Sequence, residues 1–256
     1  TTGNANVAVG YAALDANTTE SNMTAVGYRA LTAANGSSAS SAFGSDALLA
    51  CTTGNYNNAF GESSLKTVTT GASNCAFGGS ALRETTTASN NSAFGESALR
   101  ANTTGAQNTA VGGLALTANT TGSNNTAVGY AALDTATTAS DNTAIGYAAN
   151  YALTTGNQNV SIGYRAMYTN TVGDRNVAVG YGALETNNPS SNEDSYNVAI
   201  GFYALQATTT GTNNTAVGGS AMLANTTGSS NTAVGQGALD ANTTGNTNVA
   251  VGQAAG

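Results

Sequence analysis

The sequence predicts an all-β protein, a parallel β-solenoid of about 15 coils in which each coil is one 17-residue repeat. The first observation is a set of fifteen evenly spaced glycines: the glycine number rises by 17 at every step from Gly10 to Gly180, by 21 at the step to Gly201, and by 17 again up to Gly252. The second is a period-2 alternation before each glycine, which is typical of strands. The third is the β-branched character of the apolar positions. A repeat this short cannot bury a core alone, so we expect successive repeats to stack.

Positions are numbered from the repeating glycine, which is position 0. Position −2 is alanine except at Ser161, position +3 is alanine except at Ser64, and position +4 is mostly leucine. Position −1 is always a larger apolar residue: Val9, Val26, Phe43, Phe60, Phe77, Phe94, Val111, Val128, Ile145, Ile162, Val179, Ile200, Val217, Val234 and Val251.

The four consecutive repeats with phenylalanine at position −1 carry small residues at position −3, namely Ser41, Asn58, Cys75 and Ser92. Large residues therefore pair with small ones, as close packing at constant volume requires. This pairing predicts that positions −1 and −3 face the interior and that the alanine between them faces outward.

Glycine marks the corners of the predicted coil. The repeating glycine, and the glycine that closes Asn-Thr-Thr-Gly segments such as 102–105, 119–122, 225–228 and 242–245, suit corners that need positive φ or close approach. A helical repeat is disfavoured, because a unit this short, with one or two glycines and a Thr-Thr pair, cannot hold two helices.

Asparagine occupies position −4 in 13 of the 15 repeats. Stacked coils would place these amides above one another, where each could bond the amides of the neighbouring coils in a ladder. The alternative interpretation is that asparagine is only a turn former here.

The whole chain, 1–256, is predicted to be a single repeat array. Its one interruption is the segment 187–195, which contains Pro189 and lengthens one repeat by four residues without disturbing the positions on either side. We expect this segment to form an outward loop.

Composition excludes several functions. Only 7% of residues are charged and the net charge is −7, which disfavours nucleic-acid binding. No apolar run is long enough to cross a bilayer, so no membrane insertion is expected. The chain has no histidine, the usual general base, and its carboxylates Glu62 and Glu96 belong to repeats too far apart for a catalytic pair. We therefore predict no enzyme, no catalytic or metal residues and no cofactor. No disulfide is expected between Cys51 and Cys75.

The predicted coil has a thin core and should need partners. Only positions −3, −1 and +4 would supply substantial inward side chains, while the alanine columns would form a flat outer surface for another copy. Aromatic residues at position +1 are either interface anchors or a solvent-edge ladder. These are Tyr11, Tyr28, Tyr130, Tyr147, Tyr164, Tyr181 and Phe202.

The segments 176–180 and 197–201 resemble the N-S-V-A-I-G repeat of YadA-like head domains in trimeric autotransporter adhesins. The longer pattern of 125–133 resembles repeats of phage and viral tail-fibre proteins. The resemblance implies a left-handed β-roll and a homotrimer of rolls side by side. The family repeat is shorter than the one in this chain, so the Thr-Thr-Gly segment would form a wider turn or an extra edge of the coil. The segment 1–3 matches the closing segment of a repeat, so we also expect a longer fibre or end-to-end filament.

Two functions follow as expectations. The first is a structural or adhesive fibre module, extracellular, on a cell surface or on a virion, with itself and an unidentified host or cell-surface receptor as partners. The alternative is a monomeric ice-binding solenoid, motivated by paired threonines such as Thr103 and Thr104. No residue pattern identifies the ligand-binding residues of either function.

Overall fold

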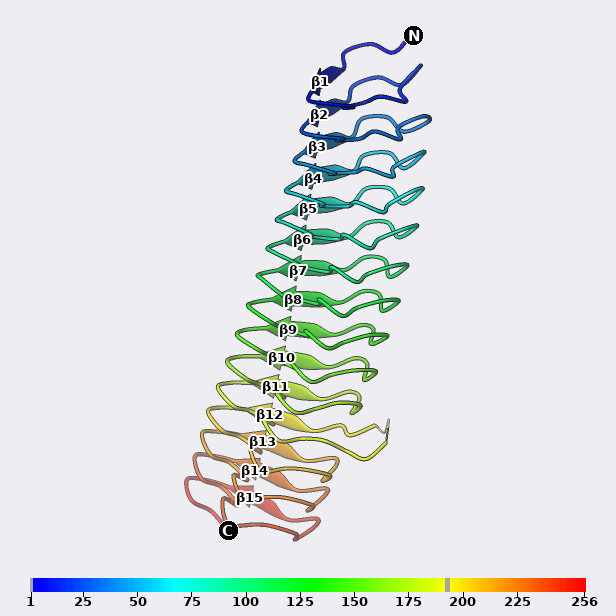
Figure 1. The fold of residues 1–256 in the computed structure, drawn as a ribbon. Helices are drawn as coiled ribbons and strands as arrows, with labels where there is room; N and C mark the ends of the chain where they lie inside the picture. The colour runs from blue at the N-terminus through cyan, green and yellow to red at the C-terminus, as the bar shows by residue number, and fades with distance from the viewer. Residues whose placement is uncertain (1, 192–193) are drawn as a thin grey trace. The chain divides into compact units, whose positions relative to one another are not determined.

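The computed structural model describes residues 2–191 and 194–256, and these contain strands but no helix. The chain divides into two compact units, Thr1–Asn124 (unit 1) and Asn125–Gly256 (unit 2), each with one three-residue strand per coil (Figure 1). Unit 1 contains β1 (Val7–Val9), β2 (Thr24–Val26), β3 (Ser41–Phe43), β4 (Asn58–Phe60), β5 (Cys75–Phe77), β6 (Ser92–Phe94) and β7 (Thr109–Val111). Unit 2 contains β8 (Thr126–Val128), β9 (Thr143–Ile145), β10 (Val160–Ile162), β11 (Val177–Val179), β12 (Val198–Ile200), β13 (Thr215–Val217), β14 (Thr232–Val234) and β15 (Val249–Val251).

Strands within each unit pair in parallel with the strand of the next coil, and like positions lie side by side. Val7 pairs with Thr24 in unit 1, a separation of one 17-residue repeat. In unit 2, Val177 pairs with Val198 across the longer 21-residue repeat. The predicted parallel β-solenoid with 17-residue coils is therefore confirmed, and the inserted segment leaves the register intact.

The repeating glycine forms the corner that follows each strand, as predicted. In unit 2, Gly146 has φ +136°, and a Cβ added there would lie 2.4 Å from the carbonyl oxygen of Gly163. A side chain at this position would clash with the next coil, and the backbone has a conformation that only glycine adopts readily.

The sidedness of the sheet is opposite to the prediction. Alanine at position −2 is buried in every coil after the first, as at Ala76 and Ala178, whereas Phe43 and Ile200 at position −1 are 37% and 41% exposed. Positions −1 and −3 therefore face outward, and the expectation that they fill the interior is wrong. The physical reason is the narrowness of a 17-residue coil, which admits only a small side chain on the inner side of the strand.

The alanine columns at positions −2 and +3 belong to the core and do not form the flat outer surface that was expected, whereas the alanines at position +6, such as Ala50 and Ala224, are half-exposed. Alanine at position +3 is also buried, as at Ala47 and Ala149, and it lies next to the buried leucine column at position +4. In unit 2 this core includes Ala178, Leu184, Leu205 and Met222. The prediction that position +4 faces inward is confirmed.

Asparagine at position −4 forms the predicted ladder. The Oδ1 atom of Asn142 accepts hydrogen bonds from the backbone N–H and the Nδ2 of Asn159, at 2.9 and 3.2 Å. Its own Nδ2 donates to Asn125 Oδ1 at 3.2 Å and to the carbonyl oxygens of Ser140 and Gly156, each at 3.0 Å. Short asparagine ladders, which were not predicted, also form at position +7 where adjacent coils both carry asparagine. Nδ2 of the buried Asn119 donates to Oδ1 of Asn102 at 2.8 Å, and Nδ2 of the half-buried Asn242 donates to Oδ1 of Asn225 at 2.9 Å.

Many non-glycine residues adopt the left-handed conformation, because positions −5, +2 and +4 of the coil all require positive φ. At position +2 the chain uses Ser220 with φ 56° in one coil, but Gly182 with φ 61° and Gly237 with φ 65° in others. This region costs a residue with a Cβ about 1 kcal/mol or more.

We expect Ser220→Gly to stabilise unit 2 by about 0.5–1 kcal/mol. Glycine avoids the steric cost of positive φ, but it loses more conformational entropy on folding, which offsets part of that gain. Chemical denaturation followed by circular dichroism measures the change. Ala224→Gly is the matched control, since Ala224 is not among the positive-φ residues, and it should lower stability. Equal effects of the two substitutions would contradict the prediction.

The inserted segment 187–195 contains no strand among its described residues. Asn188, Ser190 and Ser191 are exposed, whereas Pro189 is buried next to Gly173. Asn192 and Glu193 lie outside the described residues, so the expected outward loop is described only in part.

Candidate interaction surface

The outward face of each sheet carries an apolar column. Because side chains alternate along a strand, positions −3 and −1 share this face and the buried alanine between them points into the core. Position −1 holds valine, isoleucine or phenylalanine in every coil and is partly or fully exposed throughout. An apolar column of this kind within each unit is uncommon on the surface of a monomeric protein, which makes the column a candidate interaction site.

In unit 1 the column contains four stacked phenylalanine rings. The ring centroids of Phe43 and Phe60 are 4.7 Å apart, those of Phe60 and Phe77 are 4.3 Å apart, and those of Phe77 and Phe94 are 5.2 Å apart. All three pairs are nearly parallel, as the in-register pairing of identical residues dictates. The small residues at position −3 of the same coils lie beside these rings, so large and small side chains alternate on the outer face.

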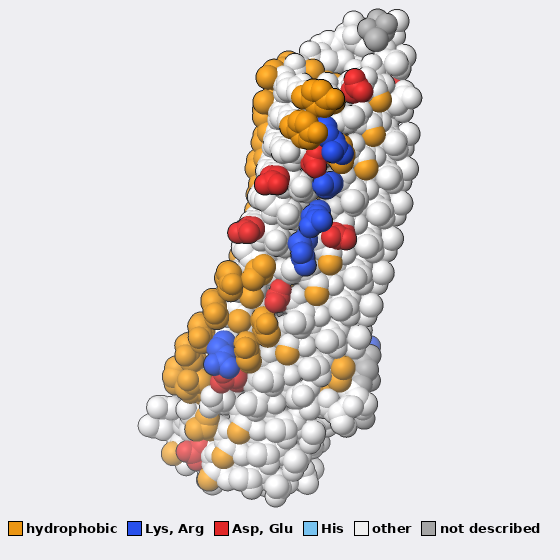
Figure 2. All heavy atoms as spheres, viewed as in Figure 1, with side chains coloured by type: hydrophobic (Ala, Val, Ile, Leu, Met, Phe, Trp, Pro, Cys, Tyr) orange, Lys and Arg blue, Asp and Glu red, His pale blue; other side chains and the backbone are white. Residues whose placement is uncertain are grey.

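A second aromatic column runs at position +1. In unit 2 the rings of Tyr130, Tyr147, Tyr164 and Tyr181 stack in succession with centroid distances of 5.7, 5.3 and 4.8 Å, and Phe202 continues the column at 5.5 Å. All five rings are exposed. Figure 2 shows hydrophobic side chains gathered along one side of each unit.

The two aromatic columns alternate along the sequence. Coils with phenylalanine at position −1 carry Ser45, Glu62, Gly79 and Glu96 at position +1, whereas coils with tyrosine at position +1 carry valine or isoleucine at position −1. No coil has an aromatic residue at both positions. The coils of Gly112, Gly218, Gly235 and Gly252 have an aromatic residue at neither position.

Basic side chains of unit 1 form a separate column, visible in Figure 2, away from the hydrophobic edge. Lys66, Arg83 and Arg100 occupy position +5 of successive coils. Lys66 pairs with Asp46 at 2.9 Å, and Arg29 contacts the same carboxylate at 3.5 Å. These half-exposed ion pairs contribute little to stability.

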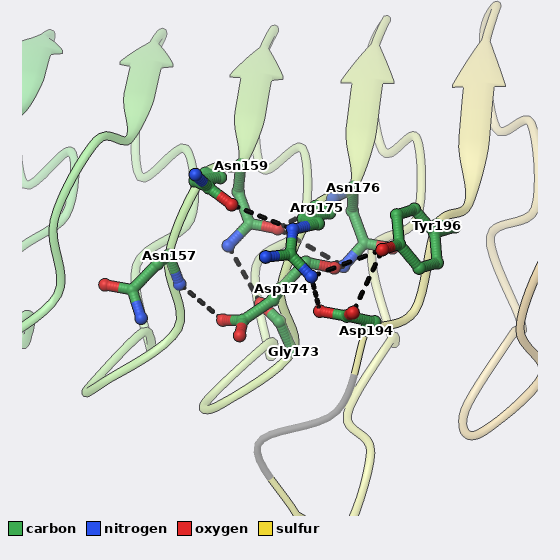
Figure 3. Close-up of polar contacts among 9 residues, drawn as sticks. Asn157, Asn159, Gly173, Asp174, Arg175, Asn176, Asp194 and Tyr196 are labelled. Atoms are coloured by element: carbon green, nitrogen blue, oxygen red, sulfur yellow. Dashed lines mark hydrogen bonds and ion pairs between the residues drawn. The ribbon is translucent and has the colours of Figure 1, made fainter.

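A polar cluster in unit 2 connects the end of the inserted segment to the preceding coil (Figure 3). Arg175 forms an ion pair with Asp194, and its Nη1 lies 3.2 Å from the hydroxyl oxygen of Tyr196. The Tyr196 hydroxyl donates to Asp194 Oδ2 at 2.9 Å. Burial raises the pKa of the neighbouring Asp174, the Asn157 amide opposes this rise, and the charge of Asp194 adds to it. The cluster was not predicted, and its geometry is that of a structural anchor.

The other residues considered for chemistry in the sequence are two cysteines and two glutamates. Both cysteines are free, as predicted, and burial raises the pKa of the Cys51 thiol. Glu62 and Glu96 are exposed at position +1 of coils that have one coil between them. Among the described residues no three histidine, cysteine, aspartate or glutamate side chains are grouped so that they could hold a metal ion.

The described parts of the chain contain no helix of the length and apolarity needed to cross a membrane. Three comparisons with known proteins found no similarity: no family model matches the chain, and no curated protein or solved structure matches it.

Proposed function

We propose that this chain is a structural fibre module whose copies associate side by side, as a homotrimer, through the outward face of their sheets. The observation that carries the proposal is the exposed apolar column at position −1. Such a column has one residue per coil at the spacing of parallel strands, about 4.8 Å. A partner that matches it along its length needs the same spacing, and a second copy of this chain has it.

The thin core supports the same conclusion. Alanine, leucine and asparagine fill the interior, while the larger valine, isoleucine and phenylalanine side chains remain outside. Covering these side chains would stabilise the chain by about 25 cal/mol for each Å² of apolar surface removed from water. The repeat's resemblance to YadA-like heads and to viral tail fibres favours a trimer in a fibre outside the cell or on a virion. Receptor binding by this fibre stays a prediction.

The oligomeric state tests the proposal. Light scattering should give three times the 25.0 kDa mass of the single chain. A variant with Phe60→Ser and Phe77→Ser should lower the measured mass to that of a single chain, because both side chains lie on the outward face and their removal opens no core cavity. Circular dichroism would verify that the variant keeps its fold.

Tyr56→Ser is the matched control, since it removes an exposed ring at position −5, away from this column, and should leave the mass unchanged. A wild-type chain that is monomeric would contradict the trimer. A trimer that survives both phenylalanine substitutions would contradict the assigned face.

The ice-binding alternative needs threonine hydroxyls that face water. The Thr103 hydroxyl donates to the carbonyl oxygen of Thr120 at 2.9 Å, so this column is used between coils. In unit 1 the adjacent Thr104 and Thr121 are exposed at the same position of successive coils, where their hydroxyls could face water, and Thr138 is exposed at this position in unit 2. A monomeric chain that produces thermal hysteresis would favour this alternative over the fibre.

A further inference from the structure

The tyrosine column of unit 2 combines ring stacking with exposed phenol groups. Between 41% and 52% of the surface of Tyr130, Tyr147, Tyr164 and Tyr181 is accessible to solvent. Successive rings are nearly parallel, with interplanar angles of 15°, 11° and 13°. The phenylalanine column of unit 1 has similar stacking without the phenol oxygen. Stacking alone therefore does not require tyrosine, and the hydroxyl group adds a chemical property that ring stacking does not need.

We propose that this tyrosine column is a site of oxidative modification, at which a peroxide-driven haem peroxidase couples neighbouring tyrosine rings into dityrosine and joins adjacent coils covalently. The inference concerns coils within one chain and does not depend on the proposed assembly.

The reaction balances with hydrogen peroxide as the oxidant. The oxidised peroxidase removes one electron and one proton from each of two phenols, and the peroxide is reduced to two water molecules. The two tyrosyl radicals carry spin density on their ortho carbons, which combine to form one carbon–carbon bond. Each ring then moves its ortho hydrogen to the phenol oxygen and regains aromaticity, so the product has lost two hydrogen atoms relative to the two tyrosines.

The column holds the reacting rings next to each other before oxidation. The Tyr147 and Tyr164 centroids are 5.3 Å apart, so their radicals would combine without diffusion of two separate chains. The hydrogen bond to Tyr203 raises the pKa of Tyr181, which makes loss of its proton harder. The pair Tyr147 and Tyr164 is therefore the expected principal product, with Tyr130 and Tyr147 next.

Two other stacked tyrosine pairs provide comparisons. Tyr151 and Tyr168 are half-buried, and the guanidinium of Arg165 lies 4.1 Å from the Tyr168 ring centroid, where its positive charge opposes formation of a radical cation. Tyr11 and Tyr28 in unit 1 are exposed, with centroids 5.5 Å apart, and should couple as one isolated pair. Tyr56 is exposed, and among the described residues it has no ring neighbour. Dityrosine that contains Tyr56 would therefore indicate coupling between separate chains.

The experiment uses the full chain with a haem peroxidase and limiting hydrogen peroxide. We expect blue dityrosine fluorescence in a band that runs at the mass of one chain on a denaturing gel, with a yield that does not change on dilution. Acid hydrolysis and mass spectrometry would quantify dityrosine. Resistance to unfolding should rise after oxidation, because the new bonds join coils that separate when the chain unfolds.

Three variants locate the bonds. Tyr147→Phe with Tyr164→Phe keeps the stack but removes every adjacent phenol pair of the column, and most of the dityrosine should be lost. Adding Tyr11→Phe and Tyr203→Phe should remove most of the remainder, because Tyr181 and Tyr203 are also adjacent, with centroids 5.3 Å apart. Tyr56→Phe alone should leave the intramolecular yield unchanged. An unchanged yield in the double variant would overturn the proposal. Failure to form dityrosine would also overturn it, as would products found only between chains and only at high concentration.

Discussion

Gly146→Ala should destabilise unit 2 by at least about 2 kcal/mol, because φ +136° is a conformation that residues with a Cβ adopt only under strain. The new methyl group would also lie 2.4 Å from the carbonyl oxygen of Gly163, so the two coils must move apart. This movement would weaken the bond between the two coils from the Gly163 N–H to the Ile145 carbonyl oxygen, which is 2.8 Å long. Chemical denaturation measures the free energy of unfolding.

Gly219→Ala is the matched control in the same unit. Gly219 has no positive φ in the left-handed range, and the nearest atom to an added Cβ is the Phe202 carbonyl oxygen at 4.0 Å. We expect its free energy of unfolding to remain within about 0.5 kcal/mol of the wild-type value. If Gly146→Ala were equally neutral, the corner would not need glycine and the assigned coil geometry would be wrong.

The repeat period predicted most of the fold, because a parallel solenoid places each residue beside its equivalent in the next coil. The strand positions, the register across the inserted segment and the asparagine ladder at position −4 all follow from that spacing. The ladders at position +7 were missed because residues such as Asn225 and Asn242 belong to Asn-Thr-Thr-Gly segments, which also suit a simple turn.

Alternation alone could not determine which side of the sheet is buried. It shows that positions −3 and −1 share a face, but both faces of the strand are apolar here. The informative signal was the near-invariance of alanine at position −2, since the narrow interior tolerates little change in volume. Position −1 varies from valine to phenylalanine, as at Val26 and Phe43, because it faces outward where a larger ring displaces no core atom.

The cluster around Arg175 could not be predicted from the repeat, because it depends on an insertion that occurs in one coil. The longer coil returns Asp194 to the edge of the stack, where it forms a parallel bridge with Asp174. No other coil has the same insertion, so the sequence offers no second copy from which this contact could be inferred. The exposed apolar column at position −1 was missed because the sidedness of the sheet was predicted the wrong way round, whereas the aromatic residues at position +1 were expected at the surface.

Asn142→Asp tests whether the buried ladder requires an amide. The substitution keeps the side chain's shape but replaces the Nδ2 donor with an oxygen that faces Asn125 Oδ1 and the carbonyl oxygens of Ser140 and Gly156. The other carboxylate oxygen keeps the hydrogen bonds from Asn159, but the oxygen that replaces Nδ2 has no donor, and a buried charge left with an unpaired oxygen should cost about 3–5 kcal/mol at neutral pH. Chemical denaturation at pH 7 and at acidic pH gives the difference from the wild-type chain.

The pH dependence separates loss of a donor from introduction of a charge. Burial among carbonyl oxygens raises the pKa of the new carboxyl in the folded state above its unfolded value of about 3.9. The charge penalty is therefore absent below the unfolded pKa, grows as the pH rises through it, and is complete above the folded pKa. The variant should recover part of its stability in acid, relative to the wild-type chain at the same pH. Asn213→Asp, an exposed change of the same kind at φ 58°, should be close to neutral at both pH values. An Asn142→Asp deficit that did not change with pH would mean that the carboxylate reaches water, and the ladder would then not be closed to solvent.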